Sequence, residues 1–274
     1  EMDPETGKGP MHGGGHMDMG RLGNNLLVNG VTDLKVSATK GTWALFRAVN
    51  TSNARYMHLK LEGHKMRVVG LDSGFLPEPY DVTVLNLAPA ERFTVLVEMA
   101  GEVGKTYRFM NSVIGGGMMS SDPLKDGWYA VASVAYGPSA VASTPTPTFP
   151  ASDAPNLQAT TPVSHDWILG MDHTIDGKLW PNVPLLTYAP NKPYTFRVTN
   201  EDMMDHPFHM HGQRFQVLEG PASVAIRGWK DTVNVPGGES VTIRTDLDNP
   251  GKWMYHCHIL EHNEFGMMGE MDAQ

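Results

Sequence analysis

Two short segments near the C-terminal end of the chain hold residues that can bind metal ions. The first reads His-Pro-Phe-His-Met-His-Gly over residues 206–212, and the second reads His-Cys-His-Ile-Leu-Glu-His-Asn-Glu-Phe-Gly-Met over residues 256–267. Together they contain six of the chain's 12 histidines and its single cysteine. Imidazole nitrogens and a thiolate sulfur are ligands for copper, zinc and iron. Such crowding indicates metal binding rather than scattered structural histidines.

The second segment can serve two metal centres if its first residues form a strand. Side chains alternate between the two faces of a strand, so His256 and His258 point one way and Cys257 the other. A loop or short helical turn can then fold His262 and Met267 back to the face of Cys257. With one histidine from a neighbouring strand, this face offers two His, one Cys and a weak Met, the ligand set of a blue-copper site.

The first segment supplies the remaining ligands. His209 and His211 share a face by alternation, whereas His206 precedes a proline and can diverge from them. His206 is therefore the candidate partner of Cys257. His209 and His211 would join the two histidines that flank the cysteine.

Two other interpretations fit less well. A closed structural zinc site accepts Cys and His, but it has no use for Met267 or for two coupled centres. A catalytic cysteine paired with a histidine would be a nucleophile, but two flanking histidines leave no obvious machinery for acyl transfer.

The elements that must position these ligands are predicted to be short strands. From Leu26 onward, runs rich in Val, Leu, Phe and Thr alternate with turn residues, and no stretch shows a long helical period. Strands at this spacing indicate β-sandwiches. They are expected at residues 26–28, 42–48, 56–61, 64–69, 81–87, 93–97, 107–111, 164–169, 194–200, 206–217, 232–235, 240–245 and 253–258.

Composition divides the 274 residues into four parts. They are a flexible Met/His/Gly-rich arm at 1–20, a β domain at 21–137, a Pro/Ser/Thr-rich linker at 138–157 and a second β domain at 158–274. The arm contains His12 and His16 and either captures copper ions or is a disordered linker. The chain opens with Glu1 and shows no signal peptide, so we expect that this is not the natural N-terminus.

Charge and hydropathy argue against two classes of partner, nucleic acids and the membrane interior. A net charge of -9 argues against a nucleic-acid partner, which needs a basic face. No apolar run approaches the roughly 20 residues of a membrane-spanning helix. A single cysteine cannot form an internal disulfide, so it says nothing about the redox compartment.

At its two histidine segments the chain resembles three-domain multicopper oxidases of the bacterial laccase-like and cuprous-oxidase type. Residues 206–212 resemble the third histidine motif of this family and 256–267 the fourth. Weaker likeness at 228–233 and 26–30 extends the resemblance over nearly the whole chain. It implies an all-β fold of two cupredoxin-like Greek-key β-sandwich domains. The first would correspond to the family's second domain, which has no copper ligands, and the second to the family's third domain. The resemblance also implies a periplasmic or extracellular location.

The resemblance implies a role for each candidate ligand. Type 1 copper would be held by His206, Cys257, His262 and Met267; type 2 copper by His209; and the type 3 copper pair by His211, His256 and His258. The family surrounds its trinuclear cluster with twice as many histidines as this chain offers. The others would come from a first cupredoxin domain on another chain or a cleaved fragment. Alone, the chain is expected to build a complete type 1 site and half of a trinuclear cluster.

The resemblance also implies a reaction, in which a reducing substrate gives single electrons to type 1 copper at the exposed edge of His262 or His206. Electrons then pass from Cys257 to the flanking histidines, and dioxygen is reduced to water. Glu261 is expected to relay protons, or else to be a surface acid. Asp202 is expected to hydrogen-bond His206 and fix its tautomer, or else to be a turn residue.

Other functions remain open at this point. A blue-copper protein that only carries electrons would not need the four additional histidines. A copper nitrite reductase would be expected to have one histidine beside the cysteine rather than two. Phenols and aromatic amines suit a laccase, which is slightly favoured. Cu(I) or another reduced metal ion would be the substrate of a metallo-oxidase. This fits the 18 methionines, including Met118-Met119 and Met203-Met204, because thioethers favour Cu(I).

Overall fold

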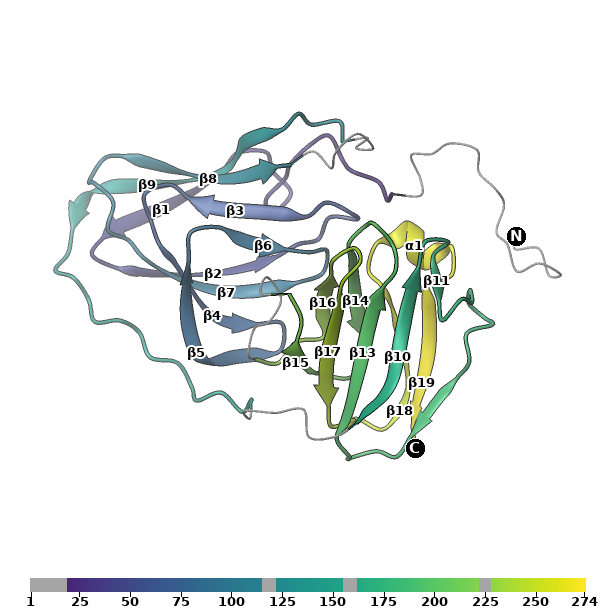
Figure 1. Cartoon of the computed structure of the whole chain (residues 1–274). Helices are drawn as coiled ribbons and strands as arrows, with labels where there is room; N and C mark the ends of the chain where they lie inside the picture. Colours follow the sequence, from purple (N-terminus) through teal and green to yellow (C-terminus); the bar gives the residue numbers. More distant parts are fainter. Residues whose placement is uncertain (1–18, 115–121, 155–161, 222–227) are drawn as a thin grey trace. The chain divides into compact units, whose positions relative to one another are not determined.

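The computed structural model describes residues 19–114, 122–154, 162–221 and 228–274. Within these residues the regular secondary structure is almost entirely β, with one short helix (Figure 1). The chain divides into two compact units. The N-terminal unit comprises Leu22–Leu71 and Glu78–Ala151, and the C-terminal unit comprises Ser152–Gln274 together with Asp72–Pro77 and the described residues before Leu22.

The N-terminal unit is built from two sheets. One has the strand order β1-β9-β8-β3-β6 and the other β2-β7-β4-β5. Val68, Val95, Val97 and Val134 are almost completely buried, as expected for inward-facing strand residues. The strands are β1 (Leu34–Lys40), β2 (Trp43–Val49), β3 (Met57–Leu61), β4 (Met66–Leu71), β5 (Gly74–Val82), β6 (Leu85–Leu87), β7 (Arg92–Glu98), β8 (Thr106–Val113) and β9 (Gly127–Ala140).

The C-terminal unit also has two sheets, in the orders β11-β10-β13-β17-β15 and β12-β19-β18-β14-β16. A five-residue helix, α1 (Leu260–Glu264), follows β18 directly. The strands are β10 (Val163–Gly170), β11 (Thr174–Ile175), β12 (Leu186–Tyr188), β13 (Tyr194–Asn200), β14 (His206–Met210), β15 (Gln216–Glu219), β16 (Thr232–Val235), β17 (Ser240–Thr245), β18 (Gly251–Cys257) and β19 (Met268–Ala273).

Aromatic rings fill the centre of the C-terminal unit. Trp167 is fully buried, and its ring centroid lies 4.8 Å from Phe196, 5.1 Å from Phe208 and 4.8 Å from Tyr255. Phe208 and Tyr255 lie on β14 and β18, the two strands that carry four of the eight candidate ligands. The packed core therefore fixes both strands against each other.

The expected all-β class and its division into two sheet-built units are confirmed. One expected strand is divided: the run at 206–217 forms β14 and β15, with Gly212 between them in a left-handed conformation at φ +62°. The run at 26–28 contributes only an isolated bridge from Val28 to Val31. Five strands were not expected, namely β1, β9, β11, β12 and β19. β9 is rich in Ala, Ser and Gly, which carry little strand signal, and it is held by pairing with β8 and β1.

Other expectations concern segments with little or no described structure. The expected linker begins inside β9, which runs to Ala140, and residues 141–154 have no regular secondary structure. Residues 155–157, Met118-Met119 and most of the expected arm, with His12 and His16, lie outside the described residues. No helix among the described residues is long and apolar enough to cross a membrane.

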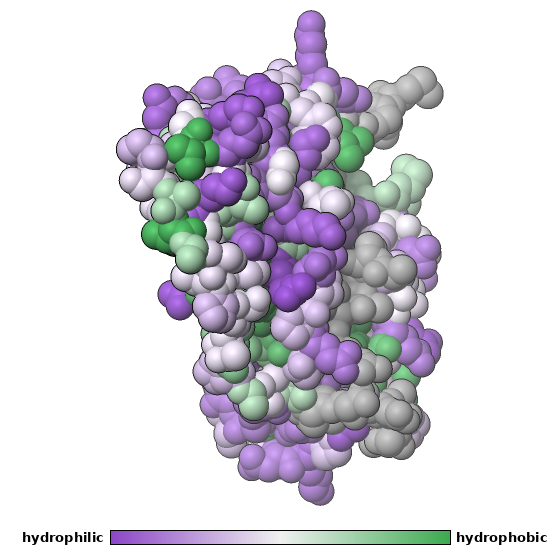
Figure 2. Space-filling view, turned by 90° about the vertical axis from the view of Figure 1, so that its left-hand side faces the viewer, coloured by the Kyte–Doolittle hydropathy of each residue, from purple (hydrophilic) through white to green (hydrophobic). Residues whose placement is uncertain are grey.

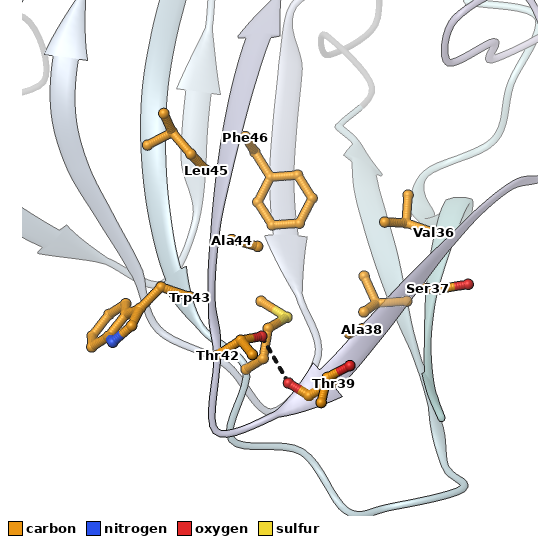
Figure 3. Close-up of a pocket in the computed structure, with 11 residues that line it drawn as sticks. Val36, Ser37, Ala38, Thr39, Thr42, Trp43, Ala44, Leu45 and Phe46 are labelled. Atoms are coloured by element: carbon orange, nitrogen blue, oxygen red, sulfur yellow. Dashed lines mark hydrogen bonds between the residues drawn. The ribbon is translucent and has the colours of Figure 1, made fainter. Parts of the chain in front are cut away.

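One face of the molecule and one small pocket of the N-terminal unit can be followed in the figures. On the face drawn in Figure 2, hydrophilic residues prevail and the hydrophobic ones are scattered in small groups. The pocket in Figure 3 is lined by β1 and β2 with Met99 and Val134, and the Thr42 hydroxyl donates a 2.8 Å hydrogen bond to the carbonyl oxygen of Thr39. None of its lining side chains titrates near neutral pH, so it offers no acid, base or charged ligand group.

Candidate metal centres

The first cluster of candidate ligands forms where β14 begins and β18 ends. These strands are antiparallel neighbours, with Phe208 opposite Cys257. Helix α1 adds His262. The Nδ1 atom of His206 lies 3.4 Å from Cys257 Sγ, His262 Nδ1 lies 3.5 Å from the same sulfur, and the two nitrogens are 3.1 Å apart. All three side chains are fully buried.

This triangle fits a metal ion. A point equidistant from the three atoms lies about 1.9 Å from each, near the metal–nitrogen and metal–sulfur distances of ~2.0–2.3 Å found for Zn sites. Two nitrogens and a thiolate in a trigonal arrangement are also the principal ligands of blue-copper sites. The residues present therefore suit copper.

Asp202 determines which nitrogen of His206 faces the cluster. Its Oδ2 atom lies 3.1 Å from His206 Nε2. Burial opposes ionisation of Asp202, but the hydrogen bonds from His206 and from the backbone amides of Met203 and Met204 outweigh it, so the pKa of the carboxyl is lowered. The ionised carboxylate only accepts hydrogen bonds. The hydrogen of neutral His206 therefore sits on Nε2, and Nδ1 presents its lone pair to the cluster.

The backbone of the predicted methionine ligand lies beside the cysteine of the first cluster. Burial raises the pKa of the Cys257 thiol to about 12, so a bound cation is needed to stabilise the thiolate in this environment. Met267 is also fully buried. Its carbonyl oxygen accepts a hydrogen bond from the amide of Cys257, and its own amide donates to the carbonyl oxygen of His262. The turn after α1 thus returns the chain to the cysteine.

The second cluster comprises the four other histidines of the two segments. Potential ligand atoms of His209, His211 and His256 lie within 4.8 Å of one another, and the Nε2 atoms of His211 and His256 are 2.9 Å apart. The ring of His258 lies 5.6 Å from those of His209 and His256. Strand pairing explains this proximity, because His209 is directly opposite His256.

Backbone carbonyls orient two of these rings. His209 Nδ1 lies 2.8 Å from the carbonyl oxygen of Asp231, and His256 Nδ1 lies 2.8 Å from that of Cys257. A carbonyl only accepts, so both Nδ1 atoms carry hydrogens and both Nε2 lone pairs are available. Burial lowers the pKa of His256 to about 4 and also lowers the pKa of His211 and His258. These imidazoles are uncharged at neutral pH, as metal ligands must be.

The two clusters are joined through a single stretch of backbone. Cys257 and the buried Tyr255 point to one face of β18, and His256 points to the other. The hydrogen bond from His256 Nδ1 to the carbonyl oxygen of Cys257 adds a second, non-covalent link between the two residues. The path between the first and second clusters is therefore short and largely covalent.

Two further predictions concern Glu261, as a proton relay, and an exposed histidine edge at which electrons would enter. Glu261 lies in the first turn of α1, where its carboxylate accepts a hydrogen bond of 3.2 Å from the amide of Arg21. Its role as a proton relay stays a prediction.

The expectation of an exposed edge on His262 or His206 is wrong, because both side chains are fully buried. The ring of His173 lies against that of His262, and Asp202 lies on the outer nitrogen of His206.

Sequence reasoning missed a buried ion pair behind the second cluster. Lys230 Nζ lies 3.2 Å from Asp72 Oδ2, and both side chains are almost completely buried. The same carboxylate oxygen accepts longer hydrogen bonds from the amides of Asp231 and Thr232. The pair thus anchors the segment that presents the Asp231 carbonyl to His209. No local pattern signals it, because its two residues are far apart in the chain.

Sequence models of the multicopper oxidase family match residues 4–139 and 148–274. The chain belongs to the multicopper oxidase family. It is 32% identical over 268 residues to the multicopper oxidase mco of Staphylococcus epidermidis, covering 92% of this chain and 53% of that protein. It is also 32% identical over 271 residues to the cell division protein FtsP of Escherichia coli, covering 92% of this chain and 55% of FtsP.

Solved structures agree with this membership. The McoA multicopper oxidase of Aquifex aeolicus superimposes with a TM-score of 0.81 at 27% identity, over 95% of this chain and 62% of that one. A laccase of Pediococcus acidilactici gives a TM-score of 0.78 at 29% identity, over 94% of this chain and 55% of that one. The chain thus spans about half the length of the curated relatives it matches. The expected family is confirmed, and with it copper binding and oxidoreductase chemistry as family properties.

Proposed function

We propose that the chain is the type 1 copper portion of a laccase-like multicopper oxidase. It would oxidise phenolic, aromatic or metal-ion donors one electron at a time and couple this to the four-electron reduction of dioxygen to water. A first cupredoxin domain, on another chain or fragment, would complete the trinuclear cluster. The observation that carries the proposal is the pairing of a His-Cys-His triangle with a four-histidine cluster on the two sides of the backbone at Cys257.

Each centre has a distinct part in this proposal. Bound copper would accept single electrons at the first cluster and reduce dioxygen at the second. His206, Cys257 and His262, with Met267 as the weak ligand, would exclude water from the first copper, since all four are fully buried. His209, His211, His256 and His258 would serve the type 2 and type 3 coppers.

The chain's own residues support electron passage between the centres. Cys257 shares a peptide with each flanking histidine, so electrons leaving the sulfur travel mainly through covalent bonds. The carbonyl of Cys257 is held by His256 Nδ1–H, which stiffens the same path. Asp202 holds His206 in the tautomer that binds metal.

Native mass spectrometry of the copper-loaded material tests the proposal first. A 30.0 kDa chain bound to a partner of about 15 kDa, the size of one further domain, with four coppers, is the expected result. Intense blue absorption that Cys257→Ser abolishes would identify the first cluster as the type 1 site. A colourless copper complex of the wild-type chain would contradict the assignment.

The alternative is a blue-copper electron carrier without oxidase activity. The name of one relative, the cell division protein FtsP, shows that the family includes members not named as oxidases. A lone chain with a single copper, blue but consuming no dioxygen with hydroquinone, would favour this alternative. The four histidines of the second cluster support the oxidase, because a carrier of single electrons has no use for them.

A further inference from the structure

The buried ligand His262 is in contact with a second imidazole that partly reaches solvent. The ring of His173 lies with its centroid 4.6 Å from that of His262, and 5.2 Å from that of Phe265. His262 is fully buried, whereas His173 and Phe265 are half-buried. The rings thus form a continuous path from the first cluster towards the surface.

The backbone of His173 indicates that this contact depends on the side chain. β10 and β11 pair with Gly170 opposite Thr174, so residues 171–173 form a three-residue hairpin loop. The last residue of such a loop commonly adopts a left-handed conformation, for which glycine is favoured. His173 has φ +58°, a conformation that an L side chain adopts at a cost. The backbone strain at His173 is explained if the contact of its imidazole with His262 serves a function.

The other approach to the first cluster is less suited to an organic donor. The ring of His206 lies 4.9 Å from that of His262, but its outer nitrogen faces the carboxylate of Asp202. Around the His173 approach the chain presents apolar side chains instead. Met171, two residues before His173, is 61% exposed, and Leu260, two residues before His262, is 54% exposed. An aromatic donor can stack on rings and pack against such side chains.

We propose that His173 is the electron-entry residue, on which an aromatic diphenol or aromatic amine stacks before it is oxidised. The inference rests on the proposed function and deepens it by naming the donor site. In the step, the donor gives one electron to the cupric ion held by the first cluster, which becomes cuprous. The phenolic O–H bond breaks, the proton passes to water, and the phenoxyl radical leaves.

Anaerobic stopped-flow reduction of the copper-loaded chain by hydroquinone tests the contact. His173→Leu fills similar space without a π face, and His173→Phe keeps a ring; both place an L side chain at the same strained position. We expect the bleaching rate constant to fall about tenfold or more in the leucine variant, in line with the cost of a misplaced reactant, and to stay near wild type in the phenylalanine variant. His58→Leu, the same substitution in the N-terminal unit, is the matched control and should bleach at the wild-type rate.

The optical and electron paramagnetic resonance spectra of the oxidised copper serve as the structural check. They should be unchanged in all three variants. An unchanged bleaching rate in His173→Leu would overturn the proposal. Equal losses in the leucine and phenylalanine variants, or loss of the blue spectrum in both, would overturn it too, because His173 would then act through its nitrogens or as structural support.

Donor binding to the metal-free full chain gives a readout that does not depend on copper. With ring-labelled histidine, a titration with hydroquinone should shift the His173 resonances saturably and leave those of His58, in the N-terminal unit, in place. Absence of a shift at His173 refutes the docking site, whereas a chain that binds copper without turning blue refutes the proposed function. The two failures are therefore distinguishable.

Discussion

Single hydrogen bonds decide which nitrogens of this site can bind metal. At the first cluster a carboxylate holds the outer nitrogen of His206, and at the second cluster carbonyl oxygens hold Nδ1 of His209 and His256. The two clusters therefore expose opposite ring nitrogens, Nδ1 in the first and Nε2 in the second. The carbonyl partners are backbone atoms and cannot be removed by substitution. Control of the histidine tautomer can therefore be tested by mutation at Asp202.

Replacing Asp202 with alanine should weaken copper binding at the first cluster. The variant leaves Nε2–H of His206 without its carboxylate, and loss of such partners lowers metal affinity about 10–100-fold. Asp202→Asn keeps a carbonyl oxygen as acceptor and should lose less. Competition with a chelator of known affinity measures both. Equal affinity in the wild type and Asp202→Ala would show that the tautomer is fixed by something else.

At the scale of elements, β14 and β18 do most of the positioning, and one glycine lets them do so. Gly212 follows His211 with φ +62°, and a Cβ atom there would collide with the ring of Trp253 on β18. The amide of His211 donates a 2.8 Å hydrogen bond to the carbonyl oxygen of Met254. The left-handed turn and the close approach of the indole thus hold the end of β14 against β18, with His211 beside His256.

Gly212→Ala should therefore destabilise the C-terminal unit and disturb the second cluster. Gly177→Ala is the matched control, because Gly177 has φ +69° but nothing within 4 Å of its would-be Cβ. The control isolates the backbone cost of about 1 kcal/mol, and overpacking against Trp253 should add about 1–3 kcal/mol. Chemical denaturation measures both. Equal losses in the two variants would mean that the indole moves aside freely.

The same elements show what a sequence can and cannot predict about this site. Alternation along 256–258 separates Cys257 from its flanking histidines, and that separation depends only on the geometry of a strand. The short turn that returns Met267 to the cysteine is likewise implied by the spacing. By contrast, the cover of His262 by His173 depends on a hairpin loop far away in the chain. The ion pair of Asp72 and Lys230 is also long-range, and weakly patterned strands such as β9 are fixed by their neighbours.

At the scale of the whole molecule, the two units draw stability from different sources. The C-terminal unit holds both ligand clusters, so metal binding stabilises it by mass action. The N-terminal unit contains a buried ion pair between Arg55 and Asp122, whose side chains are 6% and 8% exposed. Arg55 also donates a 2.7 Å hydrogen bond to the carbonyl oxygen of Gly23. Chelators and acid should therefore act on different parts of the chain.

The ion pair gives the N-terminal unit a defined response to acid. Burial opposes ionisation of Asp122, but the hydrogen bonds from Arg55 and the amide of Leu124, with the charge of Arg55, outweigh it and lower its pKa. A carboxyl with a lowered folded-state pKa contributes stability that is fully present above its unfolded pKa of about 3.9 and is lost as the pH falls through the folded value. Acid should thus weaken this unit below about pH 4, whether or not copper is bound.

Asp122→Asn tests this response. It leaves the buried guanidinium without its counter-charge, so we expect a loss of about 3–5 kcal/mol at neutral pH and a shallower dependence on acid than in the wild type. Hydrogen exchange resolved by residue should assign the loss to β3 and β8, not to β14 and β18. Glu102→Gln, in the exposed pair with Lys105, is the control and should change little. A loss spread equally over both units, or an unchanged acid dependence, would contradict the prediction, because a local buried charge must act first on the unit that contains it.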